Sequence, residues 1–170
     1  GTQTKITINK NGTGTQEIGS FTTAAGALTS TIIPEGVWST TIYTSALTSS
    51  NVSYYFNVYY VDSSGTQYAI TSVPSTSAIN ITAGVQTQTT FDVIVPYTVL
   101  PSLTSRIRII LTALFNNSGN NRKLELDFRD STIPRLYTNL PLSFAINAGG
   151  TGAVLVNNPE GSGSVYYANA

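Results

Sequence analysis

The chain has 170 residues, a length that suits one domain with a single sizeable core. It contains neither cysteine nor histidine, which excludes disulfide bonds, thiolate metal sites, serine–histidine–aspartate triads and histidine-based zinc enzymes. Only 9% of the residues are charged and the formal net charge is zero, so the basic surface that nucleic acid requires is absent.

Membrane and targeting signals are also missing from the sequence. No apolar run reaches the roughly 18 residues of a membrane helix, and the first ten residues, GTQTKITINK, lack the apolar stretch of a signal peptide. The absence of methionine suggests a piece of a longer polypeptide. Chains rich in Thr, Ser, Asn, Gln and Tyr are typical of extracellular, virion and glycan-facing proteins. We therefore expect a virion or extracellular location, with no nucleic-acid or membrane partner.

The hydrophobic pattern predicts an all-β fold. Short runs of β-branched and aromatic residues alternate with Gly, Pro, Asn and Ser, and no segment keeps a helical period. So many short strands favour a jelly-roll-like antiparallel β-sandwich, with residues 1–170 forming one domain. The expected strands are 3–9, 15–22, 37–44, 52–62, 66–71, 77–82, 86–95, 105–115, 123–129, 142–147, 152–157 and 163–167.

The segment IIPEGVW combines Pro34, Gly36 and the only tryptophan of the chain, Trp38. A tryptophan that enters a strand after a glycine can fill the core or offer a platform on which a sugar ring stacks. We favour the core.

A hairpin is predicted in SYYFNVYYVDSSGTQYAITS, where Asp62 to Gly65 supply the turn. Pairing about this turn places Tyr60 opposite Tyr68 and Val58 opposite Ile70. The opposite face of the first strand carries a polar aromatic stripe that is a candidate carbohydrate-binding surface. The alternative is that these are ordinary half-buried strand residues. The stripe consists of Tyr55, Asn57 and Tyr59.

A second hairpin is predicted between 105–115 and 123–129, across the loop NNSGNN. Period-two alternation turns one face of each strand into the core. These buried residues are Ile107, Ile109, Leu111, Ala113, Phe115, Leu124, Leu126 and Phe128. If the two strands pair, the opposite face gathers Arg106, Arg108, Ile110, Thr112, Glu125, Asp127 and Arg129.

Candidate catalytic chemistry lies on this charged face. Glu125 and Asp127 are two residues apart on one strand, at a spacing that carboxylate-based glycosidases use. A polysaccharide lyase is an alternative that needs no histidine, because arginine neutralises a uronate carboxylate and tyrosine or lysine moves the proton. A cross-strand network of ion pairs is a structural alternative to both. The candidate catalytic residues are Glu125, Asp127, Arg108, Arg129 and Tyr137, and the lyase alternative also draws on Arg106, Lys123 and Arg135.

No metal or cofactor is expected. Glu125, Asp127 and Asp130 are too few, and stand outside any D-x-D-x-D-G loop, to supply the six or more oxygens that Ca²⁺ requires. The glycines form no phosphate-binding loop that opens a helix.

The order IPEGVW, VYYVDSSGTQYAITS and SRIRIILTALF followed by LELDFRDSTIPRLYTNLP resembles a β-sandwich module of virion and fibre proteins of large DNA viruses. The match covers about residues 30 to 141. Within that group the chain is most similar to the C-terminal domains of virion-associated, cell-wall-degrading proteins of chlorella viruses. The resemblance implies that residues 1–170 are the C-terminal domain of a longer virion protein. It also implies a role in digesting or engaging the algal cell wall at entry and identifies no acting residue.

The sequence therefore yields two functional hypotheses. The first is a virion domain that degrades host cell-wall polysaccharide during entry, as a glycan lyase or a carboxylate-dependent hydrolase. The second is a carbohydrate-binding or trimeric attachment head without catalysis. In both hypotheses the partner is the host cell-wall polysaccharide. A purely structural trimerisation module is a third alternative, and a homotrimer is expected for it and for the attachment head.

Overall fold

The computed structural model describes residues 4–74, 76, 78–116, 122–128, 135–142, 155–157 and 164–167. Regular structure in these residues is entirely β-strand, as predicted, and no helix among them is long and apolar enough to cross a membrane. The strands are β1 (Thr4–Lys10), β2 (Gly14–Thr22), β3 (Ile32–Ile33), β4 (Gly36–Ala46), β5 (Ser50–Val61), β6 (Gln67–Ala69), β7 (Ile79–Ile81), β8 (Thr87–Val95), β9 (Thr98–Val99), β10 (Arg106–Phe115), β11 (Arg122–Phe128), β12 (Arg135–Thr138), β13 (Leu155–Asn157) and β14 (Ser164–Tyr167).

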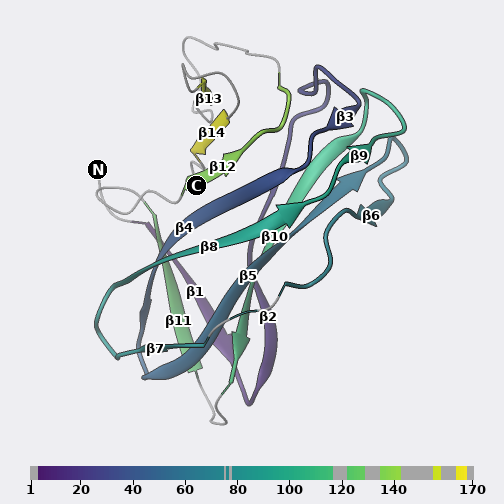
Figure 1. Cartoon of the computed structure of the whole chain (residues 1–170). Coiled ribbons are helices and arrows are strands. Elements are labelled where there is room, and N and C mark those ends of the chain that lie inside the picture. Colours follow the sequence, from purple (N-terminus) through teal and green to yellow (C-terminus); the bar gives the residue numbers. More distant parts are fainter. Residues whose placement is uncertain are drawn as a thin grey trace.

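The strands form two principal antiparallel sheets (Figure 1). Sheet 1 has the order β1-β11-β4-β12-β14-β13, and β8 pairs with the other edge of β4. Sheet 2 has the order β2-β10-β5-β6, and β7 pairs with the start of β5. A small third sheet joins β3 to β9. Strands β12, β14 and β13 lie together at one end of sheet 1 (Figure 1).

The pairing follows a simple rule that makes this a jelly roll. Each strand of the first half pairs with the strand at the mirror position in the second half: β1 with β11, β2 with β10, β4 with β8, and β5 with β6 and β7. The chain is thus one long double ribbon that turns back after β5. Two further pairings, β11 with β4 and β10 with β5, roll this ribbon into two sheets. The predicted antiparallel jelly-roll-like sandwich is confirmed.

The predicted hairpin between 105–115 and 123–129 is wrong. β10 pairs with β2 and β5 in sheet 2, whereas β11 pairs with β1 and β4 in sheet 1. The alternation itself was predicted correctly, because Phe115 of β10 and Leu124 of β11 are both buried in the same core cluster. Their apolar faces meet across the sandwich. Alternation predicts which face of a strand is buried but does not predict which strand it pairs with.

The hairpin of β5 and β6 is confirmed. Tyr60 stands opposite Tyr68, with ring centroids 4.7 Å apart and the rings stacked. Gly65 in the turn has φ 88°, a left-handed conformation that glycine adopts without strain. One oxygen of Asp62, Oδ1, accepts hydrogen bonds from the Ser64 hydroxyl and from the backbone N–H groups of Ser64 and Thr66. A carboxylate therefore holds the turn together.

Trp38 fills the core, as predicted, and is fully buried. Its indole N–H donates to Asn139 Oδ1 at 2.7 Å, and Asn139 Nδ2 donates to the carbonyls of Pro34 and Glu35. Asn139 lies so close to Gly36 that a Cβ at position 36 would meet its amide nitrogen at 2.6 Å. In the motif IIPEGVW, the missing side chain of Gly36 leaves room for Asn139. Asn139 in turn accepts the hydrogen bond of the buried Trp38 indole N–H.

Three strands were not predicted, namely β3, β9 and β12. The first two have only two residues each, too short to show any alternation. Expected strand 142–147 lies outside the described residues apart from Leu142, which forms an isolated bridge with Leu28.

We predict that Asn139→Ala lowers the free energy of unfolding by about 1–3 kcal/mol, because the buried indole N–H of Trp38 loses its acceptor. Urea denaturation followed by the fluorescence of the single tryptophan measures this change directly. Asn80→Ala is the matched control, since its hydrogen bond to Asn51 is exposed, and its effect should stay within about 0.5 kcal/mol. Equal losses in the two variants would contradict the role given to Asn139.

A second prediction concerns acid. The Ser64 hydroxyl and then the Thr66 N–H hold the pKa of Asp62 below its ordinary value. A lowered folded pKa means that the stabilisation is complete above the pKa of the unfolded chain and is lost as the pH falls through the folded pKa. The melting temperature of wild type should therefore exceed that of Asp62→Asn at pH 7, and the difference should shrink below about pH 4. A difference that does not change with pH would refute this account.

Candidate functional site

Glu125 and Asp127 do share one face of β11, as predicted, because Leu124 and Leu126 between and beside them point into the core. Glu125 Oε2 accepts a hydrogen bond from Ser45 on β4, its cross-strand neighbour. Asp127 is only 1% exposed, and its Oδ2 accepts a hydrogen bond of 2.8 Å from the amide of Gln86. The aspartate is thus covered by the segment before β8 and is engaged within the protein.

The remaining candidate catalytic residues do not join this pair. Arg108 lies on β10 of sheet 2, so the predicted common face with Glu125 and Asp127 does not exist. Both strands turn their apolar sides inward, and their polar sides therefore lie on opposite outer faces of the sandwich. Tyr137 is exposed on β12 of sheet 1, and Arg129 lies outside the described residues.

Of the lyase residues, Arg106 is on β10 and donates its Nε–H to the carbonyl of Thr23, whereas Lys123 is exposed on β11 in the other sheet. The backbone of Arg135 opens β12. In the part of the chain that the structure describes, no three acidic residues come together as a metal site. Asp130, considered above for Ca²⁺, is not among the described residues.

The polar aromatic stripe of β5 lies on the outer face of sheet 2, opposite the inward-facing Phe56 and Val58. Only Tyr59 is partly exposed, whereas Tyr55 and Asn57 are buried. The segment that follows β6 covers them: Asn57 Nδ2 donates to the carbonyl of Ser72 at 3.0 Å. Asn57 therefore ties a loop to the sheet, and the three side chains do not form one open platform.

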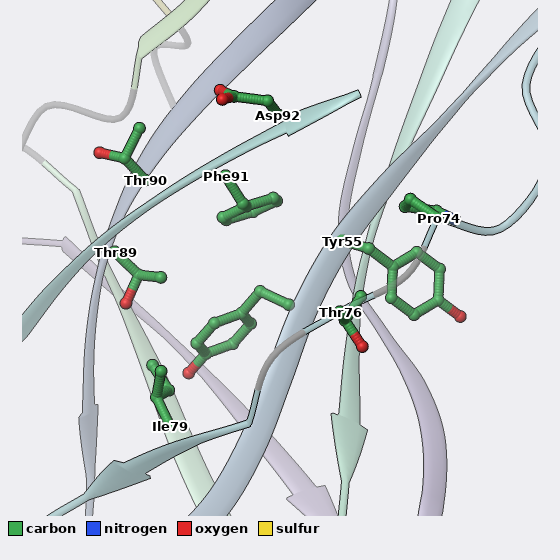
Figure 2. A pocket seen from close by; sticks show the side chains of 9 residues that line it. Tyr55, Pro74, Thr76, Ile79, Thr89, Thr90, Phe91 and Asp92 are labelled. Carbon is green, nitrogen blue, oxygen red and sulfur yellow. The ribbon is translucent and has the colours of Figure 1, made fainter. Parts of the chain in front are cut away.

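A pocket of about 270 Å³ opens where β5 of sheet 2 approaches β8 of sheet 1. Figure 2 shows Thr89 and Ile79 on one side and Tyr55, Pro74 and Thr76 on the other, with Phe91 between them. Phe91 stacks on Tyr54, with ring centroids 6.1 Å apart, and belongs to the edges of both core clusters. The full lining consists of Tyr54, Tyr55, Pro74, Thr76, Ile79, Thr89, Thr90, Phe91 and Asp92.

The pocket combines aromatic rings with several oxygen atoms. The Tyr54 hydroxyl donates to Thr44 Oγ1 at 3.0 Å, and burial raises the pKa of the Tyr54 phenol well above its usual value, so that it stays protonated. Thr90 and Asp92 are exposed beside the pocket, and alternation turns their side chains to the outer face of sheet 1, where the hydroxyls of Thr90 and Thr41 bond each other. Thr89 faces inward, and its hydroxyl is buried with no hydrogen-bond partner. A buried hydroxyl without a partner is uncommon in native proteins, and a change of rotamer would turn it toward a ligand in the pocket.

Sequence reasoning identified Tyr55 as a candidate and missed the rest of this pocket. One signal was available in TQTTFDVIV, the sequence of β8. Alternation places Thr89 on the same inward face as Phe91, Val93 and Val95, and a polar residue on a core-facing stripe marks a position that packing alone does not explain. The approach of β5 to β8 depends on tertiary structure and has no sequence signal.

Comparison with known proteins identifies no family. No family model matches the sequence, and no curated protein matches it. Among solved structures, those of infectious bursal disease virus strains Gx and Gt match with TM-scores of 0.34 and 0.36 and with 12% and 13% identity. Each match covers 98% of this chain and 38% of the viral chain. Scores this low indicate no function, and the narrower resemblance to chlorella-virus proteins gains no support from them.

We predict that Asp127→Ala lowers the free energy of unfolding by about 1–3 kcal/mol, because it removes the buried acceptor of the Gln86 amide. Lys123→Ala, at an exposed position on the same strand, should change it by less than about 0.5 kcal/mol. Chemical denaturation of both variants makes the comparison. If Asp127→Ala is as stable as wild type, the carboxylate is not structural and a catalytic role gains weight.

Proposed function

We propose that this jelly roll is a carbohydrate-binding domain without catalytic activity, carried on the surface of a virion as part of an attachment protein. The observation that carries the proposal is the pocket between β5 and β8, where stacked aromatic rings meet the hydroxyl of Thr89, which has no hydrogen-bond partner. Sugars present apolar C–H faces together with hydroxyls, so they suit a site that offers both kinds of contact.

The size of the pocket favours a small ligand. Pockets for drug-sized molecules measure roughly 300–1,000 Å³, and the volume here, about 270 Å³, is just below that range. One sugar residue at the end or the side of a glycan fits this description. The buried hydroxyl of Thr89 has no hydrogen-bond partner in the protein and is available to a sugar hydroxyl.

Degradation of host cell-wall polysaccharide is the second candidate function. Its support is the common face of Glu125 and Asp127 on β11, at roughly 7 Å for residues two apart on a strand. Against it stand the burial of Asp127 and the location of Arg108 in the other sheet. The virion location and the homotrimer are inferred from the sequence alone and form part of the same proposal.

The test is a glycan array, followed by calorimetric titration with the sugars that bind, using wild type, Thr89→Val and Thr87→Val. Thr87 faces the same side of β8 and does not line the pocket. Thr89→Val keeps the shape of the side chain and should weaken binding about fivefold, because a hydrogen bond is lost, and Thr87→Val should leave binding unchanged.

Two outcomes would overturn the proposal. The first is that no glycan of the array binds wild type at millimolar concentration. The second is that Thr89→Val binds as tightly as wild type. Release of reducing ends or of 235 nm absorbance from algal cell wall, abolished by Glu125→Gln, would instead establish the catalytic alternative.

A further inference from the structure

Arg108 is the third residue of β10, an inner strand of sheet 2 that pairs with β2 and β5. Ile107 and Ile109 on either side of it are buried in the core, so alternation places Arg108 on the outer face. In the register its direct neighbours are Tyr59 on β5 and Thr22 on β2. All three are partly exposed. The guanidinium therefore lies among hydroxyl-bearing side chains on an accessible face.

The Nε–H of Arg108 is buried and has no hydrogen-bond partner. Arg106, two residues earlier on the same face, differs in this respect, because its Nε–H donates to the carbonyl of Thr23 at 2.9 Å. Buried donors in native proteins are almost always paired, and one that is not calls for an explanation such as a bound ligand. Because no protein acceptor holds this Nε, the flexible stem of Arg108 is free to turn the guanidinium toward an anion.

No acidic residue occupies a position next to Arg108 on the described strands of this face. Glu17 stands opposite Thr112, four residues further along β10, which corresponds to roughly 13 Å. Asp62 follows β5, and its carboxylate is already engaged by Ser64 and Thr66 in the turn. Two arginines thus share a polar sheet face without a neighbouring carboxylate, which leaves their positive charge available to a ligand.

We propose that the outer face of sheet 2 at Arg108 binds the carboxylate of an acidic sugar, with Tyr59 and Thr22 beside the sugar ring. The guanidinium presents two parallel N–H groups that match the two oxygens of a carboxylate. The assignment of that carboxylate to a sugar rests on the glycan-binding function proposed above. Tyr55 of the pocket lies on the same strand face, four residues from Tyr59 and roughly 13 Å along β5, with the covered Asn57 between them, so the carboxylate site and the pocket are separate.

The experiment follows the Nε–H signals of the arginines by NMR while sodium glucuronate, glucose or inorganic phosphate is added to wild type, Arg108→Lys and Arg106→Lys. Glucuronate should shift the Arg108 signal and bind, whereas glucose, which lacks the carboxylate, should leave this signal in place. Arg108→Lys keeps the charge and loses the paired donors, so its affinity for glucuronate should fall about tenfold. Arg106→Lys should retain affinity within about threefold, because its Nε already serves Thr23.

The outcomes separate this inference from the proposed function. Unchanged glucuronate affinity in Arg108→Lys, or no shift of the Arg108 signal at millimolar glucuronate, overturns the carboxylate site, even if neutral sugars still bind in a manner that depends on Thr89. Stronger binding of phosphate than of glucuronate also overturns it, because the site would then be a phosphate site. Loss of neutral-sugar binding with the Arg108 response intact would instead count against the pocket alone.

Discussion

The whole architecture depends on one packing constraint, that the apolar faces of two twisted sheets must close on each other. Phe115 at the end of β10 and Leu124 near the start of β11 belong to one core cluster although they lie in different sheets. Each time the chain passes from one sheet to the other, the inward face of the next strand opposes that of the last. The outer faces are then divided between the two sheets, and charges that are close in sequence become distant in space.

The strand positions and their buried faces could be read from the sequence, because period-two alternation is a local property. The hairpin of β5 and β6 could also be predicted, because the short turn from Asp62 to Gly65 holds the two strands side by side in antiparallel orientation. The partners of β10 and β11 could not. A longer loop allows either a hairpin or a crossing between sheets, and the alternating pattern is the same in both cases.

For the candidate sites too, local features could be predicted from the sequence and contacts between distant segments could not. The sequence placed Glu125 and Asp127 correctly on one face, because residues two apart on a strand always share it. It could not show that Gln86 covers Asp127 or that a loop covers Tyr55 and Asn57, since both contacts join segments distant in the sequence. The pocket shows this limit most clearly, because its walls come from β5, β7 and β8 and from the segment that joins β6 to β7.

The mirror pairing of the two halves also governs the order in which the protein is made and folded. β1 and β2 pair with β11 and β10, so β1 and β2 have no partner strand until β10 and β11 have been synthesised. Meanwhile their unpaired edges are open to other chains. The hairpin of β5 and β6 joins two strands that are adjacent in the sequence, so it can form without a distant segment. We expect folding to start at this hairpin and to proceed toward both ends of the ribbon. A fold of this kind gains a closed core at the cost of slow completion.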